Sequence, residues 1–286
     1  MVKALNILIL GGTGLVGQAL HQTLQDEHQV RAFGRDIYSS TQLLTENIEW
    51  SDILIQLSGA SVAKRWTAKY KQEIWDSRIK TNQQLVDIFS TLKNKPKLIF
   101  ASAVGYYPES YCDAALDESC SEPGSDYLSL LSTRWEELAK EISNDALIFR
   151  FGVVLSKKAG ALKEMLPMYK LGLGGPIGSG EQCFPWVYIK DLVRAFSYGI
   201  NKDLTGVFNL TSPDLITQKT FGKTFAKTLR RPFYLTTFEW QLKLIFGEGS
   251  QVLTKSLAIK PTKLSEQGFI FKYPKIENTL KDIFNN

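Results

Sequence analysis

The feature that most constrains this chain is a group of glycines directly after an apolar segment near its start. The apolar run NILIL (Asn6–Leu10) is followed by Gly11, Gly12, Gly14 and Gly17. Glycine inside regular structure costs roughly 0.5–1 kcal/mol relative to alanine, so this density indicates a backbone that approaches something closely. A phosphate at the start of a helix fits the pattern, because unpaired backbone N–H groups and the helix dipole favour an anion there.

Short apolar runs alternate with helical patterns through the first two thirds of the chain. We predict strands at 6–10, 29–33, 52–57, 97–102 and 146–155, and helices at 15–24, 68–92 and 130–142. Near-continuous apolar strands that alternate with helices are typical of a parallel sheet covered on both faces. The expected fold class is therefore α/β, with a Rossmann-like doubly wound parallel sheet.

Two segments depart from a regular alternation. Between Asp36 and Asp52 there is room for little more than a short helix, so the usual third strand is expected to be reduced or missing. After Leu162 the chain is rich in Gly and Pro, and 162–190 is predicted to contribute to a substrate pocket. We predict an NAD(P)-binding domain over 1–230 and a small C-terminal α+β substrate lobe over 231–286.

The glycine spacing and the end of the second strand indicate a dinucleotide. The pattern G-x-x-G-x-x-G lies between a predicted strand and a helix, as in dinucleotide-binding units. NAD enzymes usually place an acidic residue after the second strand, whereas an Arg accommodates the extra phosphate of NADP. Here Gly34 occupies the acidic position and Arg35 follows it. Asp36 lies two residues too late to bind the ribose, so NADP (NADPH) is favoured and NAD is the less favoured cofactor.

Composition narrows the function classes. The net charge of +5 is spread along the chain without a basic run, and no apolar segment approaches the roughly 20 residues of a membrane span. We therefore expect neither nucleic acid nor membrane as a partner. The three cysteines form no C-x-x-C pair, which argues against a disulfide framework and a zinc site and suits a reducing cytoplasm. No metal is expected.

Several stretches resemble one family of proteins. They include GGTGLVGQAL, ASAVGYY, FNLTSP and GFIFKYP, together with the long run from RFGVVL to YIKDLV, and they cover nearly the whole chain. This chain is similar to the bacterial epimerase family proteins, which are atypical members of the extended short-chain dehydrogenase/reductase superfamily with a small C-terminal domain of unknown function. The resemblance implies an NADP-binding epimerase or oxidoreductase that acts on a nucleotide-sugar-like small molecule.

The resemblance also implies which residues bind the cofactor. It places Ser58 and Gly59 along the adenosine or diphosphate of the cofactor. It implies that Glu73 and Arg78 take part in NADP binding, and it places Val153 and Val154 beside the nicotinamide. Together with the glycine loop and the end of the second strand, the predicted cofactor-binding residues are Gly11, Thr13, Gly14, Leu15, Val16, Gly17, Gly34, Arg35, Ser58, Gly59, Glu73, Arg78, Val153 and Val154.

The catalytic pattern of the superfamily is incomplete here. Its members pair a serine with Tyr-x-x-x-Lys, in which the lysine lowers the tyrosine pKa. Ser102 fits the serine, but the position four residues after Tyr127 is Leu131. We predict Ser102 with Tyr106 or Tyr107 as the catalytic residues.

Other assignments stay open at this stage. Glu118 or Asp117 is an alternative acid, and a non-catalytic NADP(H)-binding sensor or regulator is the alternative function. In the Gly- and Pro-rich segment 162–190, Gly178 and Trp186 are predicted to contact the substrate, because glycines admit a ligand and an indole offers a stacking face. The oligomeric state is also open, with a homodimer as one possibility.

Overall fold

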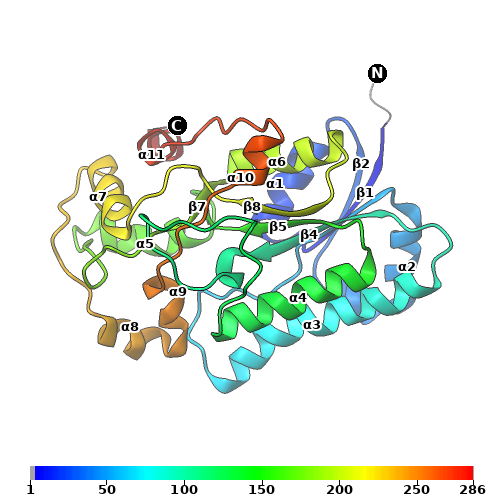
Figure 1. Ribbon diagram of the computed structural model, residues 1–286, viewed down its shortest axis with the longest axis horizontal. Coiled ribbons are helices and arrows are strands. Elements are labelled where there is room, and N and C mark those ends of the chain that lie inside the picture. The colour runs from blue at the N-terminus through cyan, green and yellow to red at the C-terminus, as the bar shows by residue number, and fades with distance from the viewer. Residues whose placement is uncertain (1–3, 286) are drawn as a thin grey trace.

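The computed structural model describes residues 4–285 and has one main sheet with helices on both faces (Figure 1). The six parallel strands lie in the order β2 (Gln29–Phe33), β1 (Asn6–Leu10), β3 (Ile53–Gln56), β4 (Lys97–Ala103), β5 (Leu147–Phe151) and β8 (Gly206–Leu210). The predicted α/β class and doubly wound parallel sheet are confirmed.

The alternation of side chains along β1 explains why both faces must be covered. Ile7 and Ile9 pack under α1 (Leu15–Leu24) and α6 (Ile189–Asn201). Leu8 and Leu10 point to the opposite face, and the helices there are α2 (Thr41–Trp50), α3 (Ala68–Thr91) and α4 (Tyr127–Ile142). Because neighbouring residues of a strand point to opposite faces, a strand that is apolar throughout is buried between two helical layers.

The segment between the second and third strands contains no further strand. The described chain passes from β2 through a short helix η1 (Arg35–Ser39) and α2 directly to β3. The main sheet therefore ends at β2, as the short spacing between Asp36 and Asp52 predicts.

The predicted single strand over 146–155 is wrong in one respect, because it is divided at Gly152. Up to that point β5 pairs with β8, whereas β6 (Val153–Leu155) pairs with β7 (Trp186–Tyr188) in a separate two-stranded sheet. A Cβ at Gly152 would lie 3.0 Å from the carbonyl oxygen of Pro185. The close approach of these two backbones accounts for a glycine where the chain changes sheets.

The last part of the chain does not lie in one place. The elements that follow β8 are α7 (Gln218–Thr228), α8 (Glu239–Phe246), η3 (Glu248–Ser250), α9 (Gln251–Thr254), α10 (Thr262–Glu266) and α11 (Ile276–Asn285). Two further helices occur earlier in the chain. These are η2 (Val104–Tyr106), between β4 and α4, and α5 (Ala161–Lys170), between β6 and β7. In Figure 1, α8 and α9 lie beyond one end of the main sheet, α10 lies against β8, and α11 lies beside α7. The predicted boundary at residue 230 stays a prediction.

A disulfide corrects one expectation from composition. Cys112 and Cys183 are joined, while Cys120 is a free thiol. The two bonded cysteines are 71 residues apart, so a search for closely spaced pairs could not find them. The bond ties the segment after η2 to the loop before β7.

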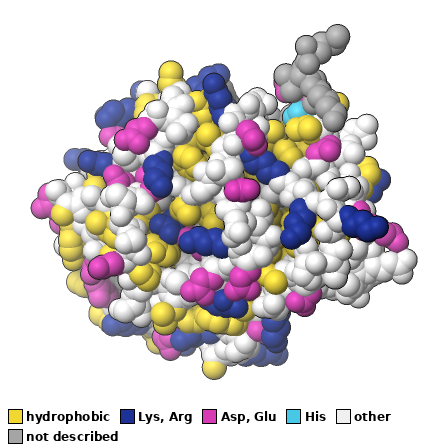
Figure 2. Space-filling view, turned by 45° about the vertical axis from the view of Figure 1, so that its right-hand side comes forward, with side chains coloured by type: hydrophobic (Ala, Val, Ile, Leu, Met, Phe, Trp, Pro, Cys, Tyr) yellow, Lys and Arg dark blue, Asp and Glu magenta, His cyan; other side chains and the backbone are white. Residues whose placement is uncertain are grey.

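Positive and negative side chains are mixed on the visible surface, and the described helices are too polar or too short for a membrane span. On the face in Figure 2, Lys and Arg side chains alternate with Asp and Glu side chains and form no band of one sign. Among residues 4–285, no helix is both long enough and apolar enough to cross a membrane.

Candidate functional site

The glycine loop after β1 is held very close to neighbouring backbone. Gly11 has a φ of +89°, which an L side chain adopts poorly, and a Cβ there would lie 2.9 Å from the carbonyl carbon of Leu57. Gly17 packs against the loop itself, since its Cβ would lie 2.4 Å from the carbonyl oxygen of Gly11. Gly14 is the N-cap of α1, and the nearest atom to its Cβ would be that same oxygen at 3.3 Å.

These three glycines therefore differ in what they do. Gly11 and Gly17 allow the strand, loop and helix to pack together, whereas Gly14 leaves space beside the start of α1. The structure describes Thr13, Leu15 and Val16 as only partly buried or exposed, so the outer side of the loop is accessible. A helix N-terminus with accessible N–H groups is a suitable site for a phosphate.

The residues at the end of β2 lie beside this loop. A Cβ at Gly34 would lie 3.2 Å from the methyl carbon of Thr13, and Arg35 follows at the start of η1. The Arg35 guanidinium forms an exposed ion pair of 3.3 Å with Glu73 on α3. An exposed pair of this kind adds little stability, so Arg35 can exchange its partner for another anion at small cost.

Arg78 is the second cation of this region. Its guanidinium donates to the carbonyl oxygens of Ala60 and Ile74 at 3.1 and 3.2 Å, and it lies directly against Gly59. Within residues 4–285 it has no ion-pair partner, and burial lowers its pKa to about 10. A partly buried guanidinium without a counter-ion favours the binding of an anion next to it.

A polar network behind Ser58 was not apparent from the sequence. The hydroxyl of Tyr38 donates to the Ser58 hydroxyl at 2.9 Å, and the Gln56 amide donates to Asn82 and to Tyr38, both at 2.9 Å. Gln56 and Asn82 are fully buried, and burial raises the pKa of Tyr38 to about 12. This network fixes the backbone after β3, where Ser58 lies against Gly11 of the glycine loop and Gly59 lies against Arg78.

The predicted catalytic serine is part of a buried ion-pair cluster. Ser102, at the end of β4, donates its hydroxyl hydrogen to Glu136 at 2.6 Å. Glu136 accepts two hydrogen bonds of 2.7 Å from the guanidinium of Arg150. Burial alone would lower the pKa of Arg150, but the hydrogen bonds and charge of Glu136 outweigh burial and raise it. Ser102 is 2 % exposed, so its hydroxyl faces this pair rather than a cavity.

The two predicted catalytic tyrosines pack around the same arginine. The guanidinium carbon of Arg150 lies 3.5 Å from the ring centre of Tyr106 and 4.8 Å from that of Tyr107. The Tyr106 hydroxyl donates to the carbonyl oxygen of Ser121, and the Tyr107 hydroxyl donates to the side chain of Asn209. Burial raises the pKa of Tyr107 to about 12. Both hydroxyls are thus engaged inside the protein, and their catalytic role stays a prediction.

The alternative acid Glu118 connects two distant segments. Its carboxylate accepts hydrogen bonds from the backbone N–H of Asn209 on β8 and from that of Lys263 on α10, at 2.7 and 3.2 Å. Burial raises its pKa, and the backbone hydrogen bonds act in the opposite direction. Asp117 instead accepts from the backbone N–H and hydroxyl of Ser119, which lower its pKa.

The residues predicted to contact the substrate lie in different environments. Gly178 has a φ of +57° and lies in an open part of the loop, where its N–H donates to Thr237. Trp186 is 1 % exposed and packs in the core with Phe221 and Tyr188. Stacking of a ligand on its ring would require this core to open, and that role stays a prediction. Val153 and Val154 on β6 are partly exposed.

Comparisons with known proteins identify relatives along nearly the whole chain. The NAD dependent epimerase/dehydratase family matches residues 7–211, and a domain of unknown function, DUF1731, matches residues 237–283. The epimerase family protein SSP1921 of Staphylococcus saprophyticus is 37 % identical over 96 % of this chain and 98 % of its own length. The resemblance to the bacterial epimerase family proteins is thereby confirmed.

Solved structures support the same fold. The human epimerase family protein SDR39U1, crystallised with NADPH, is 29 % identical and superposes with a TM-score of 0.88 over 98 % of this chain and 99 % of that chain. UDP-glucuronic acid 4-epimerase from Bacillus cereus, in complex with UDP-glucuronic acid and NAD, is 15 % identical with a TM-score of 0.78. It covers 98 % of both chains. At that identity the likeness shows the fold alone.

Proposed function

The chain belongs to the NAD dependent epimerase/dehydratase family, and from this premise we propose that it is an NADP(H)-binding epimerase or oxidoreductase. The observation that carries the cofactor choice is the end of β2, where Gly34 replaces the acidic residue and Arg35 follows it. An acidic side chain there would repel a 2′-phosphate, whereas a guanidinium binds it with charge-assisted hydrogen bonds.

The remaining predicted cofactor residues suit this assignment. In our proposal the diphosphate lies at the start of α1 over Gly14, and Ser58 and Gly59 line the opposite side. Arg78 supplies a partly buried positive charge there, which has no ion-pair partner in residues 4–285. Glu73 holds Arg35 through their 3.3 Å ion pair until the 2′-phosphate binds. A bound NADP(H) would supply hydride transfer at its nicotinamide, beside Val153 and Val154.

We further propose a nucleotide-sugar-like small molecule as the substrate. Support comes from proteins of the same fold that bind such molecules, including the UDP-glucuronic acid 4-epimerase crystallised with UDP-glucuronic acid. The alternative of a non-catalytic NADP(H)-binding sensor is favoured by one observation, which is that the Ser102, Tyr106 and Tyr107 hydroxyls all have partners inside the protein.

Replacing Arg35 by alanine is expected to weaken NADPH binding much more than NADH binding. Loss of one charge-assisted hydrogen bond costs about 1.5–3 kcal/mol, which corresponds to roughly ten- to hundredfold in affinity. The difference can be measured by calorimetric titration with the two cofactors. Lys80→Ala is the matched control, since Lys80 is an exposed cation on α3 that forms its ion pair with Asp76 on the same helix. Equal losses for NADPH and NADH in Arg35→Ala would contradict the NADP assignment.

The two candidate functions can be separated by a hydride-transfer assay. Wild type, Ser102→Ala, Tyr106→Phe and Tyr107→Phe would be compared on a panel of nucleotide sugars with NADP(H). If the predicted residues donate the proton, at least one variant loses most of the turnover while NADPH affinity is retained. In the oxidative direction, where the tyrosinate must accept the proton, we expect slow turnover that rises toward alkaline pH, because burial raises the pKa of Tyr107 to about 12 and Leu131 replaces the usual lysine. No turnover of any sugar by wild type would favour the sensor.

A further inference from the structure

Two segments of the chain hold most of the large apolar side chains that face solvent. Among residues 4–285, nine of the thirteen exposed large apolar side chains lie in residues 168–173 and 234–245. Leu171, Tyr234, Trp240 and Leu244 are each 64–72 % exposed. Exposed apolar side chains are usually scattered singly, so their concentration in two segments marks an interaction surface. We call the exposed side chains of 168–173 and 234–245 the apolar surface.

The two segments lie side by side, at the left-hand end of the molecule in Figure 1, where the chain runs from α7 to α8 next to α5. The backbone N–H groups of Tyr234 and Leu235 donate to the carbonyl oxygen of Gly174 at 3.2 and 3.4 Å. A Cβ at Gly172 would lie 3.3 Å from the ring of Pro232. The exposed side chains of the two segments therefore belong to one surface.

Helix α8 contributes to the apolar surface with the side that it does not use for packing. Leu242 is buried, and Arg65 donates to the carbonyl oxygens of Leu244 and Ile245. Trp240 and Leu244 are four residues apart, so they lie on one side of the helix, and Leu242 between them points to the other. The exposed side of α8 is therefore free to contact something outside the protein.

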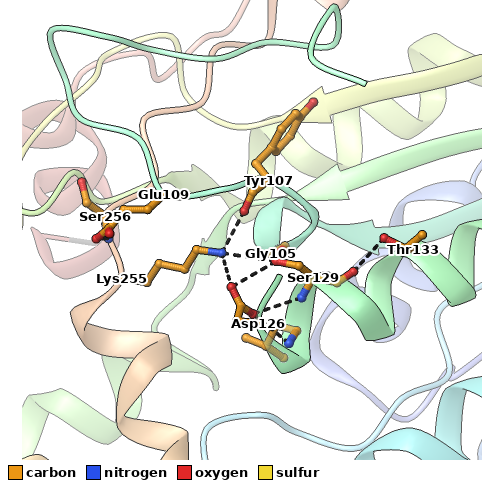
Figure 3. Close-up of polar contacts among 9 residues, drawn as sticks. Gly105, Tyr107, Glu109, Asp126, Ser129, Thr133, Lys255 and Ser256 are labelled. Carbon is orange, nitrogen blue, oxygen red and sulfur yellow. Dashed lines mark hydrogen bonds and ion pairs between the residues drawn. The ribbon is translucent and has the colours of Figure 1, made fainter. Parts of the chain in front are cut away.

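After α8 the chain is anchored to the main domain at Lys255 (Figure 3). Its ammonium donates to the Asp126 carboxylate at 2.5 Å and to the carbonyl oxygen of Tyr107 at 2.8 Å. Between α8 and α9, Glu248 forms an ion pair of 2.5 Å with Lys71 on α3. These polar contacts hold the segment on its inner side, so the apolar surface is presented on a fixed support.

The elements that carry the apolar surface are basic. Residues 161–173 and 218–246 contain eight Lys or Arg and two Glu, which gives a net charge of +6, whereas the whole chain has a net charge of +5. Lys170, Arg230, Arg231 and Lys243 are exposed, and within residues 4–285 none of them forms an ion pair. The positive charge of the protein is therefore concentrated in the elements that expose its aromatic and aliphatic side chains.

We propose that the apolar surface binds the surface of an anionic lipid bilayer. Trp, Tyr, Phe and Leu side chains beside Lys and Arg are the composition of elements that lie in a membrane interface, with the apolar side chains among the acyl chains and the cations at the headgroups. Such contact needs neither a spanning helix nor a continuous basic run, and the expectation of no membrane partner was drawn from the lack of both. This surface is assembled instead from two segments that are distant in the sequence.

A second copy of the chain fits the apolar surface less well. A symmetric contact places the same patch of both copies face to face, so the cations of one copy would lie opposite those of the other. Like charges opposed in this way weaken an association, whereas the negative headgroups of a bilayer complement them. The inference goes beyond the proposed function and does not depend on it.

The test is cosedimentation of the full-length protein with vesicles made of equal parts of phosphatidylcholine and phosphatidylglycerol, compared with vesicles of phosphatidylcholine alone. We expect at least about tenfold tighter binding to the anionic vesicles, because each Lys or Arg near such a surface contributes roughly fivefold. High salt should reduce this difference by screening. Trp240 is the only exposed tryptophan within residues 4–285, so its fluorescence should shift to the blue when vesicles are added. Trp240→Phe should keep the binding and lose the shift.

The apolar side chains have their own variant. Trp240→Ser/Leu244→Ser should weaken binding to the anionic vesicles at least about tenfold, because two large apolar side chains no longer leave water for lipid. Leu43→Ser/Ile270→Ser is the matched control, since Leu43 and Ile270 are also exposed large apolar side chains but lie outside the apolar surface.

The cations are tested separately. Arg231→Gln/Lys243→Gln should weaken binding to the anionic vesicles at least about tenfold and leave the weak binding to phosphatidylcholine unchanged. Lys93→Gln/Lys95→Gln removes the same net charge from two exposed cations that precede β4, so it is the matched control.

Three results would overturn this inference. These are the absence of wild-type binding to the anionic vesicles, equal losses in a surface variant and its matched control, and a dimer without vesicle binding that Trp240→Ser/Leu244→Ser converts to a monomer. The last result would assign the apolar surface to a second copy of the chain. Melting temperature and NADPH affinity are measured on the same variants and should be unchanged, so a failure of the cofactor assignment would appear separately.

Discussion

Replacement of Glu136 by alanine is expected to lower the free energy of unfolding by about 3–5 kcal/mol, because it leaves a buried arginine without its counter-ion. Glu136 and Arg150 are both almost fully buried, with side-chain exposures of 5 % and 6 %, and form two hydrogen bonds of 2.7 Å. Ser102 would also lose the acceptor of its 2.6 Å hydrogen bond. Urea denaturation followed by circular dichroism measures the change.

The adjacent residue on α4 provides a control. Glu137 forms an ion pair with Arg134 at 3.1 Å, but both side chains are more than a third exposed. Because exposed pairs contribute about 0–1 kcal/mol, Glu137→Ala should change stability little. If the two alanine variants are equally stable, the Glu136–Arg150 pair does not hold β5 and α4 together as we describe.

Replacement of Gly14 by valine is expected to weaken NADPH binding at least about a hundredfold while leaving the fold intact. Gly14 already has an extended backbone conformation, with φ −77° and ψ 169°, that valine adopts readily. A Cβ would meet only the carbonyl oxygen of Gly11 at 3.3 Å, so the protein itself tolerates the side chain. The branched side chain would instead fill the space that the pyrophosphate needs. Calorimetric titration with NADPH, together with a thermal melt, tests both halves of this prediction.

A neighbouring glycine should behave in the opposite way. A Cβ at Gly17 would lie 2.4 Å from the Gly11 carbonyl oxygen and 2.7 Å from the α-carbon of Gly12. Gly17→Ala should therefore lower the melting temperature, because the loop and α1 cannot both keep their positions. An unchanged NADPH affinity in Gly14→Val would indicate that the loop only connects a strand to a helix.

The elements of the main sheet could be predicted because each strand is a short apolar run buried on both faces. In β1, Ile7 and Leu8 serve opposite helical layers, so periodicity and burial agree. The change of sheet at Gly152 could not be predicted, because the run through β5 and β6 is apolar apart from Arg150 and only the close approach of Pro185 divides it. Local patterns report local conformation, and the partner of a strand is decided by distant residues.

Predicted cofactor residues that are adjacent in the sequence could be inferred, whereas contacts between distant residues could not. Gly34 and Arg35 are adjacent in the sequence, so their meaning could be inferred from the end of one strand. Lys255 contacts Asp126, which lies 129 residues earlier in the sequence, and Ser102 on β4 forms a hydrogen bond with Glu136 on α4. The disulfide between Cys112 and Cys183 is likewise a long-range contact. No spacing rule applies to such pairs, because three-dimensional packing alone brings them together.

The position of the C-terminal segment has a consequence for the order in which the protein is made. All six strands of the main sheet are complete once residue 210 has been synthesised, whereas a large group of buried apolar side chains belongs to the last thirty residues. This group comprises Leu257, Ile259, Leu264, Phe269, Phe271, Ile276, Leu280 and Ile283. Their partners on β8 and α7, and around η2 for Leu257 and Ile259, remain uncovered until these residues have been made. The dinucleotide loop can therefore form early during synthesis, whereas the core closes only when residues 257–283 have packed against the sheet and α7.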